Sequence, residues 1–304
     1  MTSPFVTILL ATYNGARHLP EQLCSLAGQT RRPEKLVVRD DGSSDDSIGL
    51  VREWGTAVGI PVHVVPAGER LGPARSFLAA LRAAGPADIY FFCDQDDVWL
   101  PEKVARAVDA VTATPADVPH LHATRLEIVD EHLQPLRAGY LPTELSFASA
   151  ACESVLTGCT MAFNTALARL LSGDPPRFLI MHDWWAYLVA TACGHVSYDA
   201  RPSLLYRQHG ANTLGASPQG LANLRARLAS FLGSESVPRS LQLLELLRLH
   251  GNTLSAPAHR LAVMLTAGSR HPALRWRAAL FAPIRRQSMS STLSTRISLL
   301  TNRF

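Results

Sequence analysis

Residues 91–101 read FFCDQDDVWLP, an apolar run that ends in three acidic residues and leads into a helix start at Pro101 and Glu102. Three carboxylates at the end of a strand repel one another unless a cation neutralises them, and hard oxygen ligands select Mg²⁺ or Mn²⁺ bound to phosphate. Ligands of open α/β sheets bind at the carboxyl ends of the strands. The string therefore predicts a strand that presents a divalent metal site. For any single acid, a solvated loop that caps the next helix is the alternative.

Two earlier apolar runs end in polar residues in the same way. Residues 35–45, KLVVRDDGSSD, place Asp40 and Asp41 where a carboxylate can accept hydrogen bonds from a base or a ribose. Residues 8–15, ILLATYNG, end in a hydroxyl, an aromatic ring and an amide, which suit stacking and hydrogen bonding to a nucleobase. Each run also fits a simple turn, because Asp-Gly and Asn-Gly are common turn sequences.

The alternation of short apolar runs with helical patterns predicts an α/β fold, with a mixed or parallel sheet covered by helices. We expect strands at 6–11, 35–39, 62–65, 89–93, 121–129, 156–163, 195–198 and 204–207. We expect helices at 18–27, 45–54, 74–84 and 183–192, with Ser43 and Ser44 as cap candidates for the second. Residues 1–105 would form a nucleotide-binding half and residues 106–216 a mixed half on the acceptor side.

Charge is distributed unevenly along the chain. Residues 1–216 contain 17 Lys and Arg against 23 Asp and Glu, whereas residues 217–304 contain 12 Arg, no Lys and 2 Glu. This asymmetry predicts a boundary near residues 215–220 and an Arg-rich extension of three or four helices. Its arginines alternate with apolar residues, as in helices on an anionic membrane surface, but a solvated bundle that stabilises the preceding α/β portion fits equally well. We do not expect nucleic-acid binding, because the first portion is acidic and no RNA or DNA module is visible.

The cysteine pattern and the N-terminus point to a cytoplasmic protein. The five cysteines are odd in number, lie far apart and form no CxxC, so neither a disulfide framework nor a zinc site is expected. No secretory signal follows Met1, and no uncharged apolar run reaches the roughly 18 residues of a membrane span. A peripheral position at the inner face of the plasma membrane is expected only if the extension binds lipid.

The three polar strand ends, in the motifs ATYNG, RDDGSSDDS and FFCDQDDVWLPEK, together resemble glycosyltransferase family 2. The resemblance extends from residue 5 to about residue 215. The string CDQDDVWLPEK, with TGCTMAFN at 157–164, HDWW at 182–185 and YRQHGAN at 206–212, is similar to the bacterial rhamnosyltransferase branch of that family. The resemblance implies a GT-A fold, a mixed and mainly parallel sheet flanked by helices, for residues 1–216, followed by the helical extension.

The same resemblance implies roles for individual residues. Asp94 and Asp96 would form the DxD pair, with Asp96 as the direct metal ligand, and His209 would reach the metal or the diphosphate from the far side. Asp183 would be the catalytic base, although a lone Asp before two tryptophans also fits a helix N-cap. The other implied nucleotide-sugar-binding residues are Thr12, Tyr13, Asn14, Asp40, Asp41, Arg75, Gln95 and Arg207. The implied acceptor-side residues are Gly158, Cys159, Trp184 and Trp185.

The implied function is inverting, metal-dependent transfer of L-rhamnose from a dTDP-sugar to a glycan or lipid-linked acceptor, with a UDP-sugar as the other donor considered and Mn²⁺ or Mg²⁺ as cofactor. Arg75, and Arg39 before Asp40, depart from the family's usual residues. A sugar-nucleotidyltransferase is the alternative enzyme class. It would require a Gly-rich phosphate-binding loop after the first strand, and residues 12–17 do not contain one. A non-catalytic carbohydrate- or membrane-binding protein on the same fold is a further alternative. An HD-type phosphohydrolase would need more His and Asp ligands.

Overall fold

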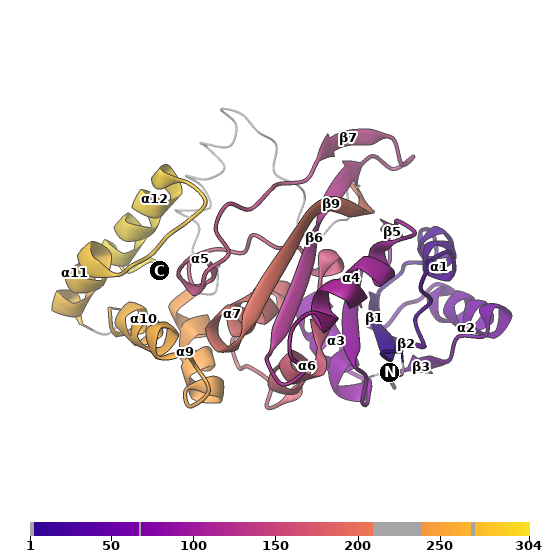
Figure 1. Ribbon diagram of the computed structural model, residues 1–304, viewed down its shortest axis with the longest axis horizontal. Helices are drawn as coiled ribbons and strands as arrows, with labels where there is room; N and C mark the ends of the chain where they lie inside the picture. Colours follow the sequence, from indigo (N-terminus) through magenta and orange to yellow (C-terminus); the bar gives the residue numbers. More distant parts are fainter. Residues whose placement is uncertain (1–2, 67, 209–238, 269–270) are drawn as a thin grey trace.

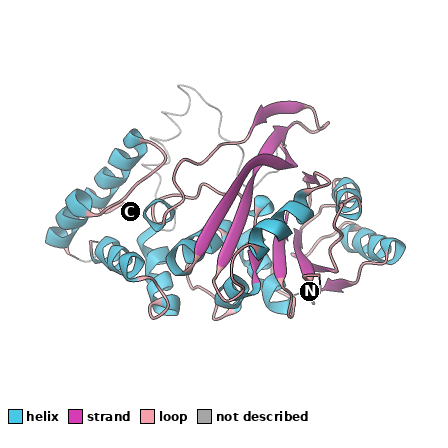
Figure 2. Cartoon of the chain, viewed as in Figure 1, coloured by secondary structure: helices cyan, strands magenta, loops and turns pink. Residues whose placement is uncertain are grey.

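The computed structural model describes residues 3–66, 68–208, 239–268 and 271–304. Within these ranges nine strands form one sheet, in the order β3-β2-β1-β4-β8-β6-β9-β5, with β7 paired to β6 (Figure 1). Helices cover both faces of this sheet, and further helices stand beyond one end of it (Figure 2). The α/β architecture expected from the alternating pattern is therefore confirmed.

The parallel half of the sheet contains the strands that were predicted from apolar runs. β2 and β4 pair with β1 on its two sides, and β3 pairs with β2, all in parallel. Successive side chains of β1 enter different cores, because Leu9 packs on one face of the sheet and Ile8 and Leu10 on the other. Burial on both faces explains why these strands are continuous apolar runs. Their bounds are Val6–Thr12 for β1, Lys35–Asp40 for β2, Val62–Val64 for β3 and Ile89–Cys93 for β4.

The helices that precede β9 divide between the two faces of the sheet. On one face lie α1 (Leu19–Ala27), α2 (Ser47–Val58) and α4 (Lys103–Thr112). On the other lie α3 (Gly72–Ala83), α6 (Thr165–Ser172) and α7 (His182–Cys193). The four helices expected from the sequence are present, with ends that differ by up to four residues.

The expected caps of α2 are wrong. Asp46 occupies the N-cap position of α2, and its side chain makes no capping hydrogen bond. Ser44 lies outside the helix, where its backbone N–H donates to Oδ1 of Asn14 over 2.8 Å. The serines therefore join the ends of β1 and β2 instead of starting the helix.

Two expectations for the second half of the sheet are also corrected. Residues 156–163 are not one strand, because a 3₁₀ turn at Gly158–Thr160 precedes the short strand β8 (Ala162–Asn164). The two short strands expected after residue 194 are one strand, β9 (His195–Arg207), which follows β6 (His120–Val129) in parallel with irregularities in register. The remaining small elements are β5 (Val98–Trp99), β7 (Pro135–Ala138) and α5 (Phe147–Ala150).

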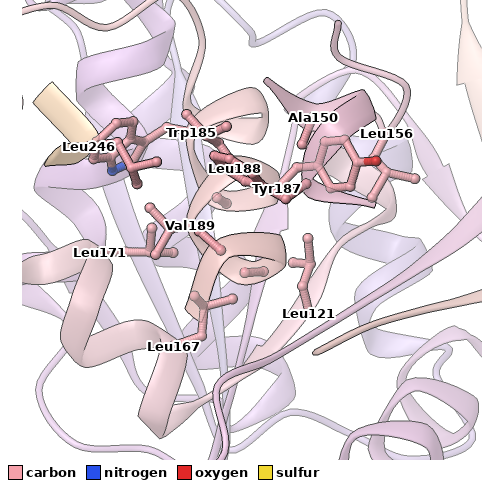
Figure 3. Close-up of a cluster of buried hydrophobic side chains, with 14 of the residues drawn as sticks. Leu121, Ala150, Leu156, Leu167, Leu171, Trp185, Tyr187, Leu188, Val189 and Leu246 are labelled. Atoms are coloured by element: carbon pink, nitrogen blue, oxygen red, sulfur yellow. The ribbon is translucent and has the colours of Figure 1, made fainter. Parts of the chain in front are cut away.

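Four helices in the described C-terminal part form a layer beyond the sheet, as Figure 1 shows. They are α9 (Arg239–His250), α10 (Ala256–Ala267), α11 (Pro272–Phe281) and α12 (Met289–Leu300). α9 packs on α7, where Leu246 lies near Trp185 in the same buried cluster (Figure 3). The expected boundary at 215–220 lies outside the described residues. In the described ranges, no helix combines the length and the apolar character that crossing a membrane requires.

Asn164 ends β8 and ties three elements together. Its Oδ1 accepts hydrogen bonds from the backbone N–H of Leu167, at the start of α6, and of His120, at the start of β6, both over 3.0 Å. Its Nδ2 donates to the carbonyl of Val118 over 2.8 Å. Because Asn164 is only 5% exposed, water cannot replace these partners.

We expect Asn164→Ala to lower the free energy of unfolding by about 2 to 4 kcal/mol, since it removes a helix cap and leaves two buried backbone groups unpaired. Ser288→Ala is the matched control, because Ser288 also caps a helix but is exposed. That control should lose only about 1 kcal/mol. Urea unfolding measures both values, and equal losses would show that the contacts of Asn164 beyond its cap contribute nothing.

Candidate active site

The acidic string after β4 places its carboxylates at different depths. Asp97 is completely buried, whereas Asp94 and Asp96 are partly accessible. Burial and the neighbouring charges of Asp96 and Asp94 raise the pKa of Asp97 well above its usual range. The acidic string is therefore an accessible pair in front of a buried third acid.

Asp94 lies between this string and a second acidic residue. Burial raises the pKa of Asp94 first, and the charges of Asp96 and Asp183 raise it further. Possible ligand atoms of Asp94, Asp97 and Cys159 lie within 4.8 Å of one another. A cation would relieve the repulsion between these carboxylates, and carboxylate oxygens suit Mg²⁺ or Mn²⁺. The donor set at this strand end therefore fits a divalent metal.

Asp183 reaches the acidic strand end from the start of α7. Its Oδ1 accepts a hydrogen bond from the backbone N–H of Trp184 over 2.7 Å, and its Oδ2 accepts one from Gly158 over 3.1 Å. Burial raises its pKa to about 6 in spite of these bonds. The N-cap of α7 is Met181, so the interpretation of Asp183 as an N-cap is wrong. The fold has instead brought Asp183 next to Asp94, 89 positions earlier in the sequence.

Gln95 joins the ends of β1 and β4. Its Oε1 accepts hydrogen bonds from Oγ1 of Thr12 over 2.7 Å and from the backbone N–H of Tyr13 over 2.9 Å, and its Nε2 donates to the Tyr13 carbonyl. A Cβ atom at Gly15 would lie 2.2 Å from Oε1 of Gln95, so a side chain there would displace the Gln95 amide from this position. The sequence pattern had assigned Gly15 only to a turn, and its role in admitting Gln95 depends on contacts across the sheet.

The ring of Tyr13 is partly exposed and carries the guanidinium of Arg70 on one face. Tyr13 is 38% exposed, and the guanidinium carbon of Arg70 lies 3.9 Å from its ring centroid. Arg70 was not predicted as a site residue, because its loop before α3 carries no recognisable motif. Stacking of a cation on the ring shows that this face accepts a planar partner.

The end of β2 is occupied by hydrogen bonds within the protein. Oδ2 of Asp40 accepts from the backbone N–H groups of Gly42 and Ser43, so this residue holds the turn. The carboxylate of Asp41 is buried and accepts from the N–H groups of Leu71, over 2.7 Å, and Gly72, over 2.8 Å. Asp41 thus anchors the loop that leads into α3.

Two of the predicted basic residues contact the protein itself. Arg207 is buried, with Nε donating to the carbonyl of Asp96 over 3.0 Å and Nη1 to the carbonyl of Glu131 over 2.6 Å. It therefore fixes the backbone of the acidic string. Arg75 is exposed on α3 and donates to the carbonyl of Arg177 over 3.1 Å. His209 lies outside the described residues.

The predicted acceptor-side residues divide between the site and the core. Gly158 contacts Asp183 directly, and Cys159 is buried beside Asp94 and Asp97. Trp184 donates its indole N–H to the carbonyl of Ala150 over 2.7 Å. Trp185 is 1% exposed and belongs to the core drawn in Figure 3.

His182, which was not predicted as a site residue, supports this side of the site. His182 is buried, with its ring stacked on Phe77 at a centroid separation of 4.0 Å and its edge toward Phe92. Burial lowers its pKa to about 3, so the ring is neutral at ordinary pH. A Cβ atom at Gly158 would lie 2.5 Å from its Nε2, so His182 and Gly158 pack in direct contact beside Asp183. Only the HDWW motif in the sequence drew attention to this residue.

An α/β sheet whose carboxyl edge gathers accessible carboxylates, an open aromatic ring and a buried acid defines a glycosyltransferase of the GT-A fold. The chain belongs to glycosyl transferase family 2, whose family model matches residues 7–164. Both the family and the fold inferred from the motifs are thereby confirmed.

Individual relatives are distant. The dTDP-rhamnosyl transferase RfbG of Shigella flexneri is 25% identical over 219 residues, which cover 68% of this chain and 74% of the relative. Among solved structures, S. aureus TarS 1-349 in complex with UDP-GlcNAc aligns with a TM-score of 0.55 at 16% identity, over 99% of this chain and 93% of that chain. The mannosyltransferase PcManGT of Pyrobaculum calidifontis, in complex with GDP-Man and Mn²⁺, aligns at 0.50 and 19% identity, over 99% and 87%. At these identities the two structures support the fold alone.

The raised pKa of Asp183 makes a prediction about stability. In the folded protein the Asp183 carboxyl stays protonated up to about pH 6, whereas in the unfolded chain it ionises near pH 3.8. The free energy of unfolding therefore falls as the pH rises from about 4 to about 6. We expect the free energy of unfolding of Asp183→Asn to lack this decrease, because Asn does not ionise, and to exceed that of wild type by about 1 to 3 kcal/mol above pH 6.

Asp199→Asn is the control, because the pKa of Asp199 is shifted in the opposite direction. Burial alone would raise the pKa of Asp199, but hydrogen bonds from Arg201 and Arg106 lower it well below its usual range. Its stabilising contribution is therefore present above about pH 4 and lost in acid, so this variant should be less stable than wild type near neutral pH. Urea unfolding between pH 4 and 8 measures both profiles. If both variants lost stability above pH 6, the assigned desolvation of Asp183 would be wrong.

Proposed function

We propose that the protein transfers a sugar, L-rhamnose, from a dTDP-activated donor to a hydroxyl group of a growing cell-surface glycan or lipid-linked acceptor, with inversion at the anomeric carbon. The observation that carries this proposal is the position of Asp183, a partly exposed carboxylate with a raised pKa next to Asp94 at the acidic strand end. The printed activity of the Shigella relative supports the rhamnosyl donor, and a UDP-sugar is the other donor considered.

The donor's nucleotide would lie along the joined ends of β1 and β2. Tyr13 offers an accessible ring for the base, and Thr12, Asn14 and Asp40 surround it with polar groups. The motion of Arg70 away from the Tyr13 ring would open this face to the base. Gln95 and Asp41 would act indirectly, because their side chains hold the strand ends and the α3 loop.

Asp94 and Asp96 would hold the Mn²⁺ or Mg²⁺ ion, because they are the acids of the string that a diphosphate can approach. When bound, the metal would neutralise the charge that develops on the departing nucleotide diphosphate. Asp97 is completely buried behind them and Arg207 fixes the backbone of Asp96, so both would position the accessible pair. The predicted His209 would add to this group from outside the described residues.

Asp183 would take the proton of the acceptor hydroxyl as that oxygen attacks the anomeric carbon. A pKa of about 6 leaves the carboxylate ionised at neutral pH, yet more basic than an ordinary aspartate. The N–H groups of Gly158 and Trp184 hold it in place. A single displacement of this kind inverts the anomeric carbon and needs no covalent intermediate with the enzyme.

We also propose that residues 1–216 are the catalytic domain of a cytoplasmic enzyme, and that the C-terminal helices contact the anionic inner face of the plasma membrane. Their shared core with α7 gives these helices a structural role as well. From residue 246 to residue 304 the chain contains no Asp or Glu, which supports attraction to an anionic surface.

The role of Asp183 as base makes a prediction about kinetics. We expect Asp183→Asn to lower kcat by about 10² to 10⁴ with little change in donor affinity, because the amide cannot accept the proton. In wild type, kcat should rise with pH through about 6, and this rise should be absent from the variant's residual activity. Steady-state kinetics with saturating donor and acceptor, and donor binding by calorimetry, measure the two effects. A variant that kept more than about a tenth of wild-type kcat would refute the assignment.

The metal assignment makes a separate prediction. EDTA, or Asp96→Ala, should lower transfer by at least about 10²-fold and weaken donor binding, because the diphosphate would meet uncompensated carboxylates. Asp117→Ala, at an exposed acid away from the strand end, is the matched control and should bind donor and Mn²⁺ like wild type. Calorimetric titration with Mn²⁺ and then with donor follows each step, and full activity in EDTA would contradict the assignment.

A further inference from the structure

Helix α12 exposes apolar residues and buries polar ones. Met289, Leu293 and Ile297 follow one another at intervals of four along the helix and are 90%, 60% and 44% exposed. On the inward side, Thr295 and Ser298 are 1% and 5% exposed, and Leu299 near the end of the helix is the one large apolar residue buried with them, at 3%. A surface helix of a globular protein normally shows the reverse arrangement.

Helix α11 repeats this inversion. Its buried residues are the small Ala278 and Ala279, whereas Trp276, Leu280 and Phe281 are 59%, 60% and 73% exposed. α11 and α12 pack against each other at one end of the molecule, beyond α10 (Figure 1). Leu274 on α11 is also exposed, by 39%. We call the six most exposed large apolar residues of the two helices the α11–α12 apolar face; they are Trp276, Leu280, Phe281, Met289, Leu293 and Ile297. Isolated exposed apolar residues are normal, but six of them on two adjoining helices mark an interaction surface.

The charges around this face are positive. Arg277 and Arg285 are exposed, the side chain of Arg285 by 77%, whereas Arg286 pairs inward with Glu153 over 2.6 Å. No Asp or Glu occurs after Glu245, so α11 and α12 carry only positive charged side chains; Arg285 also lies 3.8 Å from Glu144, in a largely exposed ion pair that contributes little. A second copy of the chain docked by the same face would bring like charges together. Anionic phospholipid offers both the apolar and the negative partner.

We propose that α11 and α12 lie flat on an anionic phospholipid surface, with the α11–α12 apolar face inserted to the depth of the headgroups and Arg277 and Arg285 on the phosphates. Amphipathic helices bind bilayers in this manner, with apolar area and charge both contributing. This inference rests on the membrane contact proposed above. It assigns that contact to the α11–α12 apolar face instead of to the whole Arg-rich extension. Because vesicle binding requires neither donor nor metal, its failure would leave the proposed sugar transfer untouched.

The first test uses the full chain and vesicles of phosphatidylglycerol or phosphatidylcholine in a flotation assay. We expect binding to phosphatidylglycerol, and the double variant Leu280→Glu, Leu293→Glu should bind at least about tenfold more weakly, because both side chains lose their apolar contact. Leu136→Glu is the matched control, since Leu136 is 55% exposed on β7, outside this face, and the variant should bind like wild type. Unchanged donor binding by the double variant would show that it is folded.

The second test reads the position of a single side chain. Of the five tryptophans, Trp276 alone is exposed, so its emission should shift to the blue when phosphatidylglycerol vesicles are added. Trp276→Phe should retain vesicle binding and lose the shift. The proposal is overturned if wild type does not float with either lipid, if the double variant floats like wild type, or if binding leaves the Trp276 emission unchanged. It is also overturned if sedimentation shows a wild-type dimer that the double variant abolishes, because a second copy would then cover the face.

Discussion

The repulsion among carboxylates at the end of β4 is the constraint around which the catalytic portion is arranged. Asp94, Asp97 and Asp183 all have raised pKa values because the surrounding structure shields them from water. Cations lie behind them: Arg207 holds the backbone of Asp96, and Lys103 is buried near Asp97, with burial lowering the pKa of Lys103 to about 8. The protein therefore maintains an electrostatically unfavourable edge that a cationic ligand would relieve, as in other sites where stability is given up for function.

Much of the sheet was predictable because its parallel strands are buried on both faces. That burial turns β1, β2 and β4 into continuous apolar runs, and polar residues follow wherever such a strand reaches the edge. The errors fall where pairing partners are distant in sequence. β9 remains one strand because β6 lies beside it for most of its length. The short strand β8 lies between β4 and β6 and pairs antiparallel with both, and these partners are 33 or more positions earlier in the sequence. Local sequence contains neither relationship.

The candidate site was predictable to a different extent. The acidic string could be read from residue types alone, whereas Asp183 depended on resemblance, because nothing in HDWW shows that α7 starts beside Asp94. Burial also separated residues that look equivalent in the sequence: Asp97 is inaccessible while Asp94 and Asp96 are not. Arg70 was missed because its contact with Tyr13 joins a loop to a strand end 57 positions earlier, and no local pattern encodes such a contact.

The packing of Gly15 against Gln95 links two positions that are 80 residues apart. No side chain can be added at residue 15 while the amide of residue 95 holds Thr12 and Tyr13, since the new carbon would lie 2.2 Å from Oε1. Residue 15 is then not free to gain a side chain while Gln95 keeps its present position. Among descendants of a common ancestor, a side chain at position 15 should therefore accompany a residue at position 95 that has been replaced or has turned away from Thr12 and Tyr13, so the two positions should vary together.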